Sequence, residues 1–244
     1  MNDRLVEWLR GVMGTALEKL LSSEGSLAVV VEHALPPDML RDLYEELCSS
    51  KQWFQELWVL DEREEAHKVS FEEFAASNRK FSNNDSIHES RRTSLFVLTS
   101  FQEALASEEL ASEISSWFEA EMRFISLDVA RYGPGTSLAQ HADLFGGRVL
   151  GAVFFISPGW SVGCGGELFI WDAAGQCRKI PPIQGSVALF PIHPMYSHAV
   201  AEVREWERIS LAAHFGIPED NPTKVWLRAS DLRVWATSQS AEAE

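Results

Sequence analysis

Apolar residues recur every three or four positions over the first part of the chain, which is the spacing of an amphipathic helix. From about Asp3 to Ser22 the apolar stripe includes Leu9 and Leu20 and predicts one long helix. Residues 51–85 are mixed and charged, and the segment 82–85 predicts a loop. Pattern and turn residues predict four further elements before residue 123: a strand over 26–32, a helix over about 35–48, a strand over 93–98 and a helix over about 101–122.

The pattern changes at Phe124 to short apolar runs of strand length, separated by Gly, Pro and Asp. Many short strands with turn signals between them are typical of a sandwich or barrel, and eight suit a double-stranded β-helix of jelly-roll type. We therefore predict an α+β fold in which N-terminal helices pack against this β-helix core. The eight runs are Phe124–Tyr132, Leu138–Asp143, Arg148–Ile156, Glu167–Trp171, Cys177–Ile180, Ser186–Pro191, Ser197–Val203 and Arg208–Phe215.

Length and composition are compatible with one domain that has a substantial core. The chain has 244 residues, 45% of them hydrophobic, and shows no internal repeat and no interdomain linker. We predict a single domain over 1–236, with 1–122 as a largely helical support region and 123–217 as the β-helix core. The stretch 237–244 is rich in Ser, Ala and Glu and predicts a disordered tail.

The net charge and the cysteine content limit which binding partners and which cellular compartment are expected. The formal net charge of −15 argues against a nucleic-acid backbone or an anionic membrane as the main partner, and leaves open a basic peptide or an amine. No membrane span or signal peptide is expected, and Cys48, Cys164 and Cys177 have no short metal-type spacing. These features predict a cytoplasmic protein with reduced thiols. They do not predict its oligomeric state.

Candidate metal ligands stand in two of the predicted strands. His141 and Asp143 are two residues apart, so on a strand their side chains point to the same face. A third ligand, His198, lies in a later strand-like run. Two histidines and one carboxylate on one face of a metal form the facial triad of non-haem Fe(II) oxygenases. The four other histidines with no such context are assigned no metal role: His33, His67, His88 and His193.

Arg208 and Ser210 place a guanidinium and a hydroxyl on one face of the last predicted strand. Arginine binds a carboxylate through two parallel hydrogen bonds, so this pair is a good carboxylate site. The alternative is a surface salt bridge of Arg208 with Glu205 or Glu207. The ligand set upstream favours the buried, carboxylate-binding role.

Taken in order, these motifs resemble the prolyl 4-hydroxylase group of 2-oxoglutarate/Fe(II) dioxygenases. The resemblance covers roughly Phe124 to Phe215 and is closest to the ribosomal-protein prolyl hydroxylase branch. It is specific for the superfamily and much less so for the substrate. The motifs that carry it are Tyr132-Gly-Pro-Gly-Thr-Ser-Leu-Ala-Gln-His141-Ala-Asp143, Gly165-Gly-Glu-Leu-Phe-Ile-Trp-Asp172 and His198-Ala-Val…Glu202-Val203…Arg208.

The resemblance implies a cofactor set and a role for each motif. Fe(II) would be held by His141, Asp143 and His198, and the distal carboxylate of 2-oxoglutarate by Arg208. Dioxygen is the other cosubstrate, with ascorbate as a reductant. Halogenases of the superfamily lack the carboxylate ligand, so Asp143 favours hydroxylation, with desaturation and epoxidation left open. Two finer roles have plain structural alternatives: Tyr132 as a cosubstrate contact or a core residue, and Gly165-Gly166 as a turn that lets the next strand reach the site or a simple hairpin turn.

Three positions depart from the family pattern or face the site, and we predict that they contact substrate. Phe155 stands where many relatives carry a second cosubstrate-binding Tyr, and Ser210 is the candidate to replace its hydroxyl. His214 replaces a Trp and, by parity with Arg208, points into the barrel, either to substrate or as a core histidine. Asp128 has the parity of Tyr132 and pairs either with a substrate amine or with an arginine of the protein such as Arg148.

The leading functional hypothesis is hydroxylation of a prolyl residue in a protein or peptide. The alternatives are hydroxylation of a free amino acid or small metabolite, and a cupin-like metal protein without redox turnover. Cupins have no need of Arg208. The segment 51–90 separates the first two, because a loop that closes over a groove favours a peptide and a sealed lid favours a small molecule.

Overall fold

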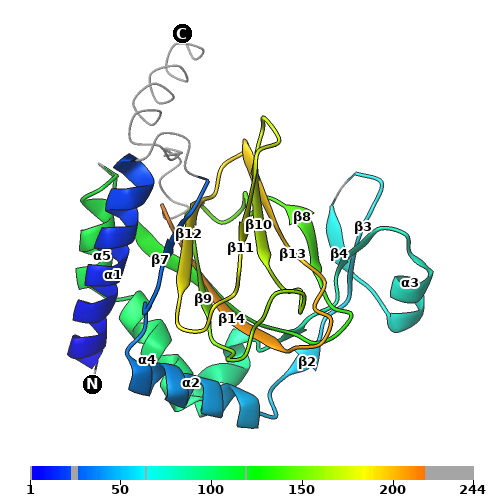
Figure 1. Ribbon diagram of the computed structural model, residues 1–244, viewed down its shortest axis with the longest axis horizontal. Coiled ribbons are helices and arrows are strands. Elements are labelled where there is room, and N and C mark those ends of the chain that lie inside the picture. The colour runs from blue at the N-terminus through cyan, green and yellow to red at the C-terminus, as the bar shows by residue number, and fades with distance from the viewer. Residues whose placement is uncertain (1, 23–26, 64, 119, 218–244) are drawn as a thin grey trace.

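Two antiparallel sheets face each other, and most of the helices cover the outer side of one of them (Figure 1). The computed structural model describes residues 2–22, 27–63, 65–118 and 120–217. The predicted tail 237–244 lies outside these residues. No helix among the described residues is long and apolar enough to cross a membrane. The predicted α+β fold with a double-stranded β-helix core is confirmed.

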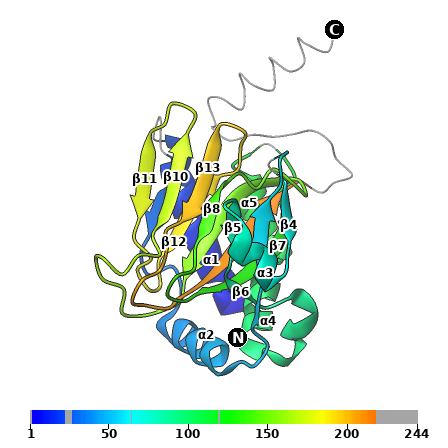
Figure 2. The ribbon, with the colours of Figure 1, turned by 90° about the vertical axis from the view of Figure 1, so that its right-hand side faces the viewer.

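Each sheet has seven strands. The first has the order β1-β12-β9-β14-β7-β6-β2 and the second β11-β10-β13-β8-β5-β3-β4; the second is spread across the view of Figure 2, from β11 to β4. The strands are β1 (Val29–Val31), β2 (Phe54–Gln55), β3 (Trp58–Leu60), β4 (Ala66–Lys68), β5 (Lys80–Ser82), β6 (Asp85–Ser86), β7 (Arg123–Tyr132), β8 (Leu138–His141), β9 (Arg148–Phe155), β10 (Leu168–Asp172), β11 (Cys177–Ile180), β12 (Val187–Pro191), β13 (Tyr196–Val200) and β14 (Arg208–Gly216).

The helices come mainly from the N-terminal half, as predicted. They are α1 (Asn2–Ser22), α2 (Pro37–Ser49), α3 (Phe71–Ala76), α4 (Phe96–Leu105), α5 (Glu108–Ser115) and the 3₁₀ helix η1 (Glu89–Ser94).

Two predictions in this half were wrong. The segment 93–98, predicted as a strand, contains the end of η1 and the start of α4. The carboxylate of Glu46 accepts the backbone N–H groups of Val97 and Leu98, at 3.0 and 2.8 Å, and so caps the helix from a distant part of the chain. The helix predicted over 101–122 is two helices, because Ser107 accepts the N–H of Leu110 and begins a new one.

The segment 51–90 is more ordered than its charged composition predicts. It supplies five short strands that extend both sheets, and α3, whose first turn is closed by a capping box between Ser70 and Glu73. The loop predicted around 82–85 is confirmed at residues 83–84, because β5 ends at Ser82 and β6 begins at Asp85. This segment therefore lengthens both sheets at one end of the strand order.

Strand β14 shows how the alternation of side chains divides the core from the site. Its odd-numbered residues from 209 to 215 join the large cluster that the helices cover. Arg208, Ser210 and His214 alternate with them and point between the sheets. The helices therefore bury one face of the first sheet and leave the other for chemistry.

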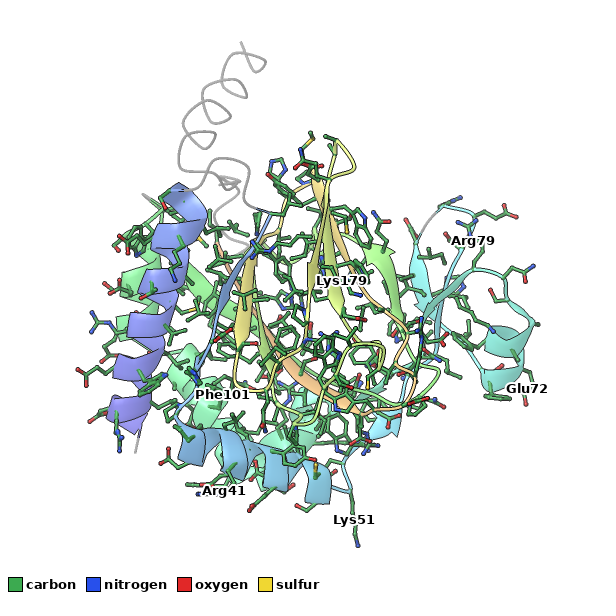
Figure 3. All side chains as sticks on the ribbon, in the orientation of Figure 1. Arg41, Lys51, Glu72, Arg79, Phe101 and Lys179 are labelled. Atoms are coloured by element: carbon green, nitrogen blue, oxygen red, sulfur yellow. The ribbon has the colours of Figure 1, made fainter. Side chains whose placement is uncertain are left out.

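Phe101 anchors α4 to the first sheet, and its replacement with Ala is expected to lower the free energy of unfolding by about 3–5 kcal/mol. The ring is fully buried and meets Phe154 of β9 edge-to-face at 5.2 Å; Figure 3 shows it turned into the molecule, whereas Lys51 points away. Denaturant unfolding measures the change. Phe96, on the same helix and 70% exposed, is the matched control: its Ala variant is expected within about 0.5 kcal/mol of wild type.

Candidate active site

His141 and His198 face each other across the ladder of β8 and β13, which lie side by side in Figure 2. Their rings are 4.2 Å apart between centroids. Asp143 lies two residues beyond the end of β8, so the prediction that the strand runs to Asp143 was wrong. The backbone turns there, with the N–H of Phe145 donating to the carbonyl oxygen of Asp143 at 2.9 Å.

These three side chains converge on one point. One potential ligand atom from each lies within 4.8 Å of the others, and among the described residues this is the group that could hold a metal ion. Asp143 Oδ1 is 3.3 Å from His141 Nε2, and Asp143 Oδ2 is 3.4 Å from His198 Nε2. His141 Nδ1 is 2.8 Å from the carbonyl oxygen of Ala139. A carbonyl can only accept, so Nδ1 carries the proton and Nε2 offers its lone pair to a metal.

The charge states of the cluster also suit a cation. Burial opposes ionisation of the Asp143 carboxyl, but its contacts with His141, His198 and His214 outweigh burial and hold the pKa of that carboxyl far below its usual range. Burial lowers the pKa of His198, which leaves the imidazole neutral near pH 7. An ionised carboxylate and neutral imidazoles are the forms that bind metals.

A glycine makes room for the aromatic ring that packs against His198. The ring of Phe190 lies 5.0 Å from that of His198, between centroids. A Cβ at Gly151 would come within 2.7 Å of the Phe190 ring. The absence of a side chain at Gly151 therefore lets Phe190 support the histidine.

Arg208 lies deeper between the sheets and is 2% exposed. Its Nη1 donates to the carbonyl oxygen of Gly166 at 2.8 Å, while its Nε is the one buried side-chain polar atom among the described residues without a hydrogen-bond partner. Burial lowers the pKa of Arg208 to about 10, so the guanidinium stays charged at neutral pH. A buried cation with an unused donor fits an anionic ligand. The alternative of a surface salt bridge is wrong.

Gly165 and Gly166 allow the chain to approach Arg208 closely. Both have φ of +75°, and a Cβ at Gly165 would lie 1.9 Å from the carbonyl oxygen of Glu202. Gly166 presents its carbonyl to Arg208. The pair therefore forms a close contact with the site as well as a turn.

Tyr132, Phe155 and Ser210 surround Arg208. Tyr132 faces Arg208 across β7 and β14, and burial raises the pKa of its hydroxyl to about 12, so it stays neutral. The guanidinium carbon of Arg208 is 5.3 Å from the ring of Tyr132 and 5.2 Å from that of Phe155. Ser210 is opposite Phe155 and 4% exposed. Phe155, predicted as a substrate contact, is 1% exposed and packs against Arg208.

A second group of polar residues surrounds the Asp143 carboxylate. Asp128 is paired with Arg148, at 3.4 Å, and its side chain is 56% exposed; this is the protein-side partner proposed for it above. His214, predicted to face the barrel, is 2% exposed and reaches Asp143 Oδ2 with its Nε2 at 3.2 Å. Ser126 contacts both Arg148 and His214 and was missed. Its parity with Asp128 on one predicted strand was the available signal.

A cavity of about 390 Å³ opens beside this group. One wall is β7, including Ser126, Asp128 and Tyr132, and the other is formed by residues of 84–92 with Glu56. Neither Phe155 nor His214 lines it. Of the three predicted substrate contacts, only Asp128 faces this open space.

Residues 127–216 match the family model described as the 2OG-Fe(II) oxygenase superfamily. This segment contains all three members of the metal cluster and Arg208. The β-helix core of this chain is therefore similar to that superfamily. A search of curated protein sequences finds no match.

Solved structures share the fold of this oxygenase at low sequence identity. A prolyl-4-hydroxylase from Pseudomonas putida is 19% identical, with a TM-score of 0.59, and covers 84% of this chain and 98% of its own. A Trichoplax adhaerens prolyl hydroxylase, solved with a hypoxia-inducible-factor peptide fragment, is 16% identical, with a TM-score of 0.63 and coverages of 85% and 90%. The epimerase SnoN from nogalamycin biosynthesis, dependent on α-ketoglutarate, is 14% identical, with a TM-score of 0.56 and 83% coverage of both chains.

The oxygenase uses Fe(II) and 2-oxoglutarate, and its residues fit both. Two neutral imidazoles and a carboxylate suit Fe(II) and leave coordination positions open. The unsatisfied Nε of Arg208 suits a carboxylate. The cupin-like alternative without redox turnover is therefore not supported.

Proposed function

We propose that His141, Asp143 and His198 hold Fe(II), and that Arg208 binds the distal carboxylate of 2-oxoglutarate. The observation that carries this proposal is the buried guanidinium with an unused donor in the same barrel as the three-residue cluster. When bound, the iron with 2-oxoglutarate and dioxygen supplies the oxidation of an unactivated C–H bond.

The neighbours of Arg208 complete the proposed cosubstrate site. The neutral hydroxyl of Tyr132 and the hydroxyl of Ser210 offer hydrogen bonds to the cosubstrate, and Phe155 keeps water from the guanidinium. A buried charge pair of this kind is stronger where water is excluded. These residues would orient 2-oxoglutarate with its keto acid end toward the metal cluster.

We further propose that the substrate is a prolyl residue in a protein or peptide. The cavity along β7 supports this, because Glu56 and residues of 84–92 line it as a wall built onto the sheets instead of sealing it as a lid. A groove open at its mouth admits an extended chain, whereas a free amino acid needs enclosure on all sides. Asp128, half exposed in that wall, is the proposed substrate contact.

The substrate proposal is tested by mass spectrometry on a peptide library with Fe(II) and 2-oxoglutarate. A gain of one oxygen atom on prolyl residues is expected, and each reactive peptide is compared with a partner in which that Pro is Ala. The Ala partners and the Asp143→Ala enzyme are expected to give no product. Oxygen gained by free amino acids or metabolites, with none on peptides, would favour the small-molecule alternative.

A further inference from the structure

Asp143 differs from His141 and His198 in how its backbone is held. The two histidines pair across β8 and β13, so the sheet fixes their positions. Asp143 lies beyond the end of β8, in a turn whose hydrogen bonds run from Leu144 to Ala142 and from Phe145 to Asp143. Among the described strands, none pairs with Asp143 to hold its backbone. The orientation of its carboxylate therefore depends on side-chain contacts.

His214 makes the shortest of the side-chain contacts to that carboxylate. Its Nε2 is 3.2 Å from Asp143 Oδ2, whereas Arg148 Nη1 is 3.6 Å from Oδ1, beyond a good hydrogen bond. His214 stands outside the three-residue cluster that could hold a metal. It therefore contacts a candidate ligand and not the metal position itself.

The neighbours of His214 determine which of its nitrogens carries the proton. Arg148 Nη2 donates to Ser126 Oγ at 2.8 Å, because an arginine side chain can only donate hydrogen bonds. The hydroxyl hydrogen of Ser126 is then free to point at His214 Nδ1, which is 3.1 Å away. In this arrangement Nδ1 accepts, so Nε2 carries a proton and donates a hydrogen bond to Asp143.

Asp128 does not change this assignment. Its Oδ2 is 3.6 Å from His214 Nδ1, which is longer than the bond from Ser126, and it lies 3.4 Å from Arg148 Nη2. The side chain of Asp128 is 56% exposed and partly solvated. The serine hydroxyl is the nearer partner of the ring.

We propose that His214 is a positioning residue that orients the Asp143 carboxylate for metal binding, with Ser126 and Arg148 fixing the ring tautomer that makes it a donor. The proposal rests on the metal-binding role proposed for Asp143. A ligand oriented before the metal arrives loses less freedom on binding, and partners of this kind are worth roughly 10–100-fold in metal affinity.

Three variants test this role by titration of the metal-free protein with Mn(II). His214→Leu removes the donor and is expected to weaken Mn(II) binding by roughly 10–100-fold. His214→Gln keeps an N–H at a similar reach and is expected to restore most of the affinity. Ser126→Ala leaves the ring in place but frees its tautomer, so a smaller loss is expected. Thermal unfolding of each metal-free variant shows whether the fold is kept.

The pattern across the variants separates a positioning role from a packing role. Wild-type Mn(II) affinity in His214→Leu, or a His214→Gln no better than His214→Leu, would overturn the proposal. If His214→Leu does not fold, Ser126→Ala decides by the same measurement, and unchanged affinity there counts against the proposal. Wild-type protein that binds Mn(II) no better than Asp143→Ala would overturn the proposed metal site itself, and this inference with it.

Discussion

Asp143→Ala is expected to abolish both metal binding and the release of succinate from 2-oxoglutarate. The variant removes the only carboxylate of the three-residue cluster, and with it the negative charge that two neutral imidazoles cannot supply. The loss should exceed the roughly 10–100-fold typical of removing a residue that only supports a metal ligand. Mn(II) titration measures the first effect, and succinate release with Fe(II) measures the second.

A charge-matched control accompanies this variant. Asp38 is exposed on α2, and Asp38→Ala makes the same change in net charge away from the proposed site. It is expected to leave both measurements unchanged. Bound Mn(II) should also raise the unfolding temperature of wild type but not that of Asp143→Ala, because only the folded wild type binds it. Metal-dependent turnover that survives in Asp143→Ala would show that the ligand assignment is wrong.

Arg208→Met is expected to weaken 2-oxoglutarate binding. It is not expected to lower the free energy of unfolding of the protein without metal and cosubstrate. Loss of one partner of a buried charge pair costs about 2–5 kcal/mol, which is roughly 30-fold or more in affinity. In the free protein the guanidinium is 2% exposed and its Nε has no partner. A similar-sized apolar side chain removes that desolvation cost, so the stability of the free protein is expected to be equal or higher. Affinity and stability should therefore move in opposite directions.

The measurement is stabilisation by 2-oxoglutarate in thermal unfolding with Mn(II) present. Wild type is expected to be stabilised in proportion to the logarithm of the cosubstrate concentration, and Arg208→Met to show little stabilisation. Arg208→Lys keeps the charge but not the paired donors, and should fall between them. The exposed Arg204→Met is the control. Unchanged affinity in Arg208→Met would contradict the assignment.

Alternation along the strands was enough to predict much of the site. The parity of Arg208, Ser210 and His214 placed all three on the inner face of β14, and the cluster of His141, Asp143 and His198 assembled as predicted. The assumption that His141 and Asp143 lie on one strand was wrong, however. Asp143 is not on the strand. It meets the histidines because the chain turns after His141 and because His214 contacts its carboxylate.

Local pattern failed where a distant residue decided the conformation. The apolar run 93–98 has the composition of a strand, but Glu46 of α2 caps its backbone as the start of α4. The charged segment 51–90 carries no strong periodicity, and it becomes strands because the open edges of two existing sheets supply partners. Neither partner is visible in a window of neighbouring residues.

The sequence by itself determined which side chains could converge on a metal and on a carboxylate, because side-chain period along a strand and the donor atoms of His, Asp and Arg are local properties of the chain. It also determined the helical and β-rich halves. The reaction class was what the resemblance implied. Only the tertiary structure decided that Phe155 and His214 are buried against Arg208 and Asp143, and that Ser126 joins them. Those contacts link β7, β9 and β14 with the turn after β8. They depend on strand register and on the path of that turn, which arise when the sheets pack and not from the spacing of residues along the chain.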